Sequence, residues 1–219
     1  MKTFRLSIAL SLCLILTFNI GMINGQNQFK TQDEAIVKAQ QNFAALIEGS
    51  KWDFGVGAAD IKNARAMQPL SYKQVDFNNL LDAGNAKSFL DLKSNMINYV
   101  VPFELKGAIV AVIQISKNEE VWQIVGTGNP AIRIELNKLP GELIKNGFEN
   151  LSIYDVPNII ATVYVVELRA DEVCFTDYAG FSFEKGGMES QLILEHLNKD
   201  AMMFQEKYGD QLKEQKLTN

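Results

Sequence analysis

A glycine-rich stretch in the middle of the chain has the spacing of a phosphate-binding loop. Residues 126–131 read Gly-Thr-Gly-Asn-Pro-Ala, which fits the G-x-G-x-x-A pattern whose glycines let a pyrophosphate approach the backbone at a helix start. That loop requires a parallel βαβ unit. Here the preceding segment, residues 121–125, is the third strand of a meander with short turns, which predicts antiparallel pairing. We therefore expect a glycine-rich strand exit, with Pro130 starting a helix, and no cofactor.

Cys174 and His196 are the candidates for a thiolate–imidazole pair. Cys174 is the only cysteine beyond Cys13, and His196 is the only histidine. The apolar neighbours of Cys174 are typical of a small core residue in a strand. His196 falls outside the apolar stripe of its helix and near Asp200, so we expect it to face water. No catalytic residue is assigned, and a Cys-dependent hydrolase stays open as an alternative.

Metal binding has little support in the residue types of the chain. A zinc site with one cysteine and one histidine would need carboxylates for most of its ligands. Asp171, Glu172, Asp177 and Glu184 crowd one stretch, but they lack the alternating spacing of a calcium loop. We predict no metal site, and we interpret this stretch as a charged hairpin edge that resists edge-to-edge pairing.

The N-terminus has the composition of a secretory signal. Lys2 and Arg5 precede residues 6–18, a run of apolar and small residues that is short for a membrane span. The composition turns polar after Gly25. We predict a signal peptide at residues 1–25 and a secreted or periplasmic protein; an uncleaved N-terminal anchor is the alternative.

Charge and apolar content limit the partners. The chain has a formal net charge of −5, and removal of the signal would make it more negative. Without a basic cluster, nucleic acid is not an expected partner. No second long apolar stretch follows residue 25, so we expect no transmembrane segment in the mature chain. A secreted or envelope protein is the expected partner.

Local signals place the elements that must position these residues. Thr31 with Glu34 has the spacing of a capping box and predicts a helix over residues 32–48. Residues 98–105, 108–116 and 121–125 have the composition of three strands joined by short turns, the first at Lys106-Gly107. Further strands are predicted over residues 70–77, 151–156, 161–169, 172–175 and 180–183. Further helices are predicted over residues 132–143, broken near Pro140-Gly141, and over residues 188–208, capped near Gly209.

This order of elements predicts an α+β fold with antiparallel meander sheet packed against helices. Residues 103–107 and 166–170 are similar, as are residues 70–75 and 151–156. The similarity leaves two organisations open: one domain over residues 26–219, or two similar halves at about 26–128 and 129–210.

The stretch over residues 31–128 resembles secreted cystatin-like and PepSY-like domains. Residues 123–127 read Gln-Ile-Val-Gly-Thr and are similar to the Q-x-V-x-G loop of cystatin-type inhibitors, with Thr127 in place of the last glycine. Asp33-Glu34-Ala35, with Ala39 and Phe43, looks like the opening of secreted peptidase propeptides. The resemblance implies an inhibitor or a propeptide-like partner of a secreted peptidase.

The hypothesis that best fits these observations is an exported, non-enzymatic binding or interaction module of unknown ligand. The inhibitor or propeptide-like partner is the first alternative, and the Cys-dependent hydrolase is the second. The predicted contact residues lie around the glycine-rich stretch: Trp122, Gln123, Val125, Gly126, Thr127 and Gly128.

Overall fold

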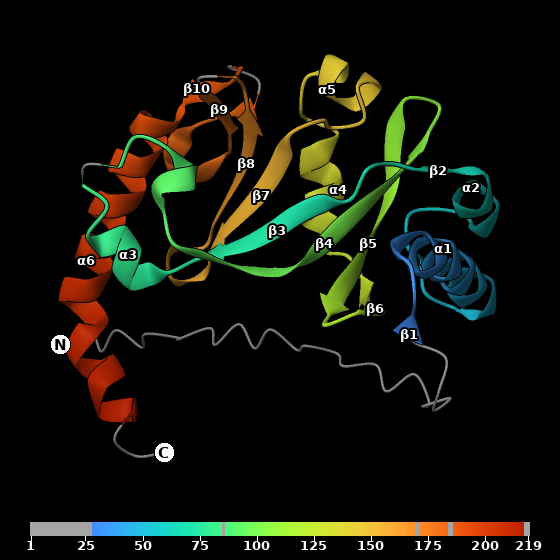
Figure 1. Cartoon of the computed structure of the whole chain (residues 1–219), viewed down its shortest axis with the longest axis horizontal. Coiled ribbons are helices and arrows are strands. Elements are labelled where there is room, and N and C mark those ends of the chain that lie inside the picture. Colours follow the sequence, from blue (N-terminus) through green and yellow to red (C-terminus); the bar gives the residue numbers. More distant parts are fainter. Residues whose placement is uncertain (1–27, 85, 170, 184–185, 217–219) are drawn as a thin grey trace, which may run out of the picture.

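The computed structural model of the chain describes residues 28–84, 86–169, 171–183 and 186–216 (Figure 1). The predicted signal peptide at residues 1–25 lies outside the described residues. The described part is a mixed α+β fold built on one ten-stranded, mostly antiparallel open sheet. Among the described residues, no helix has both the length and the apolar content that crossing a membrane requires.

The strands follow the order β1-β6-β5-β4-β3-β7-β8-β9-β10 across the sheet, and β2 also pairs with β4. Their bounds are β1 Gln28–Phe29, β2 Arg65–Ala66, β3 Leu70–Val75, β4 Ser94–Leu105, β5 Ala108–Asn118, β6 Val121–Thr127, β7 Leu151–Val156, β8 Ala161–Glu167, β9 Glu172–Phe175 and β10 Met188–Glu189. The helices are α1 Gln32–Gly49, α2 Ala58–Asn63, α3 Phe77–Leu81, α4 Pro130–Leu136, α5 Gly141–Lys145 and α6 Ser190–Lys216, with 3-10 turns at Phe89–Asp91, Pro157–Ile159 and Tyr178–Gly180.

Two antiparallel meanders meet at the centre of the sheet. Strands β3 and β7 begin the meanders and pair in parallel, with Ser71 opposite Ser152. Parallel neighbours need a long connection, and here it contains α3, the other strands of the first meander (β4, β5 and β6), α4 and α5. Of the two similar pairs of segments, residues 70–75 and 151–156 are therefore central neighbours, whereas the ends of β4 and β8 are separated by β3 and β7. Their origin by duplication stays a prediction.

Helices cover both faces of the sheet and divide the core into three clusters. Helices α4 and α5 cover one face, which we call the α4 face. On the other face, α1 and α2 lie at one end and α3 and α6 at the other (Figure 1). Strand alternation sends neighbouring side chains to opposite faces: Ile153 packs under α4, and Tyr154 packs in the cluster beneath α6.

Two local sequence signals, the helix cap at Thr31 and the turn at Lys106-Gly107, form the predicted structures. The Thr31 side chain accepts from the Glu34 N–H at 3.2 Å, and the Glu34 carboxylate accepts from the Thr31 N–H at 3.4 Å, which confirms the capping box. The β4–β5 turn confirms the predicted hairpin, since Lys106 and Gly107 have φ of 55° and 83°. Two positive φ values in a two-residue turn match the right-handed twist of the flanking strands.

Three boundary predictions change. A strand over residues 180–183 is wrong: Ala179 and Gly180 have φ of 53° and 84°, which turns the chain in a 3-10 segment, and the last strand is β10. The last helix does not end at Gly209, because Gly209 lacks the left-handed backbone of a helix cap and α6 continues to Lys216. The helix predicted over residues 132–143 begins at Pro130 and is two helices, α4 and α5, divided near Pro140 as expected.

The unequal lengths of β5 and β6 leave part of β5 at a free edge. The last β6 partner is Thr127, opposite Ile113, so β5 continues without β6 from Val112 back to Ala108. Side chains of the α4 region replace the missing strand. Asn137 accepts from the Ile109 N–H and donates to the Ile109 carbonyl, both at 2.8 Å. This edge is therefore blunted against pairing with another chain.

Replacing Asn137 by alanine should lower the free energy of unfolding by about 1–3 kcal/mol, because both backbone groups of buried Ile109 lose their partner. Asn78→Ala is the matched control, since Asn78 is an exposed residue of α3. Urea unfolding of both variants measures the difference. Equal midpoints for the two variants would contradict this role of Asn137.

Candidate functional site

The predicted contact residues Trp122 and Gln123 lie inside the sheet. They pair with Phe29 and Gln28 of β1 on one side and with β5 on the other. The Trp122 ring packs against Tyr99 with ring centroids 5.3 Å apart. Both residues are half-buried, so they support the sheet and do not project from a loop.

Val125 and Gly126 also belong to β6. Val125 is the extra residue of a β-bulge, because Gly126 pairs with Gln114 while Ile124 pairs with Ile115. The bulge leaves Val125 54% exposed. The letters that resemble an inhibitor loop therefore lie within a strand, and only residues 128–129 separate β6 from α4.

Gly128 is required by packing. A Cβ at this position would lie 2.6 Å from Val112 Cγ2 and 3.1 Å from the Val112 carbonyl oxygen. The Gly128 N–H donates to that same carbonyl at 2.9 Å. The glycine thus lets the chain leave β6 while pressed against β5. Antiparallel pairing of β6 with β5 confirms the expectation that this stretch is a strand exit.

A cavity of about 80 Å³ lies beside the free edge of β5. It exists at this place because β6 has ended while α1 and α4 still cover the two faces of the sheet. Its wall is mainly apolar and comes from α1, the segment before α2, β5, the β6 exit and α4. The lining residues are Phe43, Phe54, Val56, Val110, Ala111, Val112, Thr127, Gly128, Pro130 and Arg133.

Two of the predicted contact residues, Thr127 and Gly128, line this β5-edge cavity. The others do not. Arg133 was missed at the sequence level, although it is the charged residue of the wall and donates to the Val110 carbonyl at 3.4 Å. The sequence places Arg133 in the first turns of the helix after Pro130. The side of the helix that faces the cavity depends on how α4 packs, which the sequence does not show.

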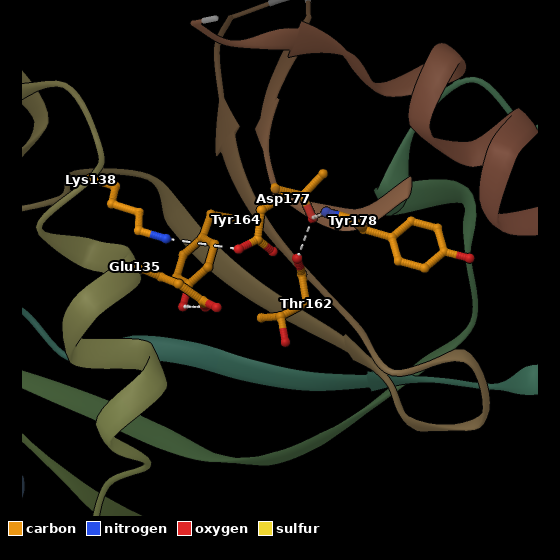
Figure 2. A network of polar contacts seen from close by, with 7 residues as sticks. Glu135, Lys138, Thr162, Tyr164, Asp177 and Tyr178 are labelled. Atoms are coloured by element: carbon orange, nitrogen blue, oxygen red, sulfur yellow. Dashed lines mark hydrogen bonds and ion pairs between the residues drawn. The ribbon is translucent and has the colours of Figure 1, made fainter. Parts of the chain in front are cut away.

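Two tyrosines and two carboxylic acids contact one another on the α4 face, and we call this group the acid–tyrosine cluster. It contains Tyr72, Glu135, Asp155 and Tyr164. The Tyr164 hydroxyl on β8 donates to Glu135 Oε2 on α4 at 2.7 Å, and Tyr72 shares a hydrogen bond with Asp155. Figure 2 shows Glu135 beside Tyr164, with Lys138 reaching Asp177 at 3.8 Å.

Burial dominates the electrostatics of the acid–tyrosine cluster. It raises the pKa of Asp155, and the hydrogen bond from Tyr72 offsets part of that rise. Burial also raises the pKa of Glu135, with the Tyr164 hydrogen bond and the Lys138 charge acting in the opposite direction. The pKa of Tyr72 rises to about 12 through burial and the nearby Asp155. Each tyrosine therefore remains a donor at neutral pH and holds a carboxylate that is partly removed from water.

The structure does not bring Cys174 and His196 into contact. Cys174 shares a hydrogen bond with Ser190 at 3.1 Å, and burial raises the pKa of the thiol to about 12, so it stays protonated at neutral pH. His196 is exposed and packs edge-on against Phe181, with ring centroids 5.0 Å apart.

Glu172 organises the buried side of this region. Its carboxylate accepts from the Ser190 hydroxyl at 2.6 Å, from the Ser88 hydroxyl at 2.6 Å and from the Phe89 N–H at 2.8 Å. The contacts join β9, the start of α6 and the Phe89–Asp91 turn. Glu172, one of the acidic residues predicted to form a charged hairpin edge, therefore also stabilises the contact between these three elements.

Within the described ranges, no three His, Cys, Asp or Glu side chains are grouped so that they could hold a metal ion. No protein-family model, curated protein or solved structure matches the chain. The mixed α+β class is confirmed by the structure, and the cystatin-like or PepSY-like type stays a prediction.

Gly128→Ala should lower the free energy of unfolding by about 1–3 kcal/mol, because the added methyl group overlaps Val112. Gly126→Ala is the matched control, since a methyl group added there would meet no other atom within 4 Å. Thermal unfolding of both variants measures the effect. If Gly126→Ala costs as much as Gly128→Ala, the close approach at Val112 is not the reason for the glycine.

Asp155→Asn should raise the melting temperature at pH 7 by about 2–4 °C at most. A raised carboxyl pKa means that the folded state binds the proton more tightly than the unfolded chain. The associated stability is therefore complete below the ordinary value of 3.8 and is lost as pH rises through the folded pKa.

The gain from Asp155→Asn should shrink as the pH falls through the raised folded pKa and should be absent below 3.8, since Asp155 is then protonated in both states. Melting curves between pH 3 and pH 7 measure it, with the exposed Asp171→Asn as control. A variant that is less stable than the unaltered protein at pH 7 would show that the charge of Asp155 stabilises the fold.

Proposed function

We propose that the chain is an exported, non-enzymatic binding module that takes an apolar group of its ligand into the β5-edge cavity. The composition of residues 1–25 supports export. The observation that carries the binding role is the cavity itself, which opens at a sheet edge and has walls from five different elements. Concave, mainly apolar sites with few polar groups are typical of ligand binding.

The walls of the cavity are held before any ligand arrives. Phe43 packs edge-on against Phe54 with ring centroids 5.8 Å apart, which joins α1 to the segment before α2. The Gly128 N–H and Arg133 both bond to β5 carbonyls. A site that is formed in advance avoids the entropy cost of ordering its own side chains.

The size of the cavity limits the ligand group. A volume of about 80 Å³ accommodates a branched alkyl group of about five non-hydrogen atoms. Burying about 100 Å² of apolar surface contributes about 2.5 kcal/mol. This contribution is smaller than the binding free energy of about 4 kcal/mol that corresponds to a Kd of 1 mM. The cavity therefore binds one group of the ligand, and the ligand needs a further contact.

The neutral probe isovaleramide tests this proposal. We expect saturable NMR shifts of the Val56 and Val112 methyl groups, with a Kd on the order of 10 mM. Val110→Phe should abolish these shifts, because the larger side chain fills the cavity. The matched control Val125→Phe places the same change on the exposed β6 bulge and should keep the binding.

The proposal is contradicted if the shifts rise linearly with probe concentration. It is also contradicted if a folded Val110→Phe protein binds isovaleramide as well as the unaltered protein does.

A further inference from the structure

Arg133 is the charged side chain in the wall of the β5-edge cavity. Arg133 is half-buried in the wall. In the part of the chain that the structure describes, Lys62, Arg65 and Lys138 form the ion pairs, and Arg133 pairs with no carboxylate. Its hydrogen bond goes to the Val110 carbonyl at 3.4 Å. A guanidinium has five N–H donors, so most of its donor capacity is unused.

The segment before α2 holds the guanidinium against the cavity. Gly55 has a φ of 67°, and a Cβ at this position would lie 3.6 Å from Arg133 Nη2. The neighbouring Asp53 forms no ion pair with Arg133 among the described residues, and its carboxylate accepts from the Gly55 N–H at 2.7 Å. The backbone of this segment therefore faces Arg133 with a glycine and leaves its charge available.

We infer that the β5-edge cavity binds a carboxylate carried on a short, branched apolar group, with the carboxylate on Arg133 and the alkyl part between Phe43, Phe54 and Val112. This inference rests on the proposed function and names the ligand class of the same site.

The chemistry of the wall selects this class. A planar guanidinium matches a carboxylate in a two-pronged arrangement, and such charge-assisted bonds are stronger than those between neutral groups. Such bonds are stronger beside apolar surface than in open water. The carboxylate supplies the further contact that the apolar burial alone lacks.

Two sources share this chemistry: a free short-chain acid, and the C-terminal carboxylate of a peptide that ends in valine or leucine. The probes are isovalerate with its amide, and acetyl-Gly-Gly-Leu with its C-terminal amide. NMR titration of the unaltered protein at pH 7 gives the four affinities. A free acid as the natural source predicts that isovalerate binds at least as tightly as the peptide acid; a peptide source predicts tighter binding of the peptide acid.

In either case we expect the acid to bind about tenfold more tightly than its amide. Equal affinities of acid and amide would overturn the inference while leaving the proposed function intact. Failure of both acids and both amides to bind would remove the proposed function and the inference together. This comparison needs no variant, so it does not depend on how a substitution folds.

Arginine variants test the role of the charge directly. Arg133→Gln should remove the preference for acid over amide and leave amide binding within about twofold. Arg133→Lys keeps the charge without the planar fork and should retain only part of the preference. The matched control Arg65→Gln removes an exposed arginine that already pairs with Glu104 and should keep the full preference. A folded Arg133→Gln protein that still prefers the acid would overturn the assignment.

Discussion

The mismatch between β5 and β6 is the constraint on which the site depends. A strand edge with unpaired N–H and C=O groups must be satisfied or covered. Here β6 ends at Thr127, and the chain turns at once into α4, whose Arg133 and Asn137 bond to the β5 backbone. The helix therefore packs where the strand is missing. The space between this helix, α1 and the uncovered β5 edge is the cavity.

The same constraint explains why an arginine is half-buried without a carboxylate. Its contact with the Val110 carbonyl helps to close the edge, and a single long hydrogen bond leaves most of its donors available. An ion pair inside the wall would have neutralised the charge and filled the space. The Arg133 side chain thus both bonds to the β5 backbone and keeps donors for a ligand.

The acid–tyrosine cluster shows the opposite arrangement on the other side of α4. Glu135 and Asp155 are partly desolvated carboxylates held by tyrosine hydroxyls, and burial raises the pKa of both. Desolvated carboxylates weaken a fold at neutral pH unless hydrogen bonds compensate. The tyrosines supply part of that compensation, since the pKa of both carboxyl groups stays raised. Helix α4 separates the two groups, since Arg133 faces the cavity and Glu135 faces β8.

The elements with local signals were predictable, and the site was not. The capping box at Thr31 and the Lys106-Gly107 turn act through neighbours in the chain, so their residue types suffice. Residues 50–69 have no regular apolar period in the sequence. Their elements, α2 and β2, are short and are stabilised by packing on α1 and pairing with β4. Arg133 carries no local signal for a cavity. Its role follows from the point where β6 ends, which is set by pairing across the sheet and by the close approach of Gly128 to Val112.

The most direct measurement of the central claim is the position of bound isovalerate in the protein. The account predicts intermolecular NOEs from the isovalerate methyl protons to the side chains of Phe43, Val56 and Val112, together with a shift of the Arg133 guanidinium protons at saturation. NOEs to any other surface, or an unchanged Arg133 signal in the saturated complex, would contradict the account.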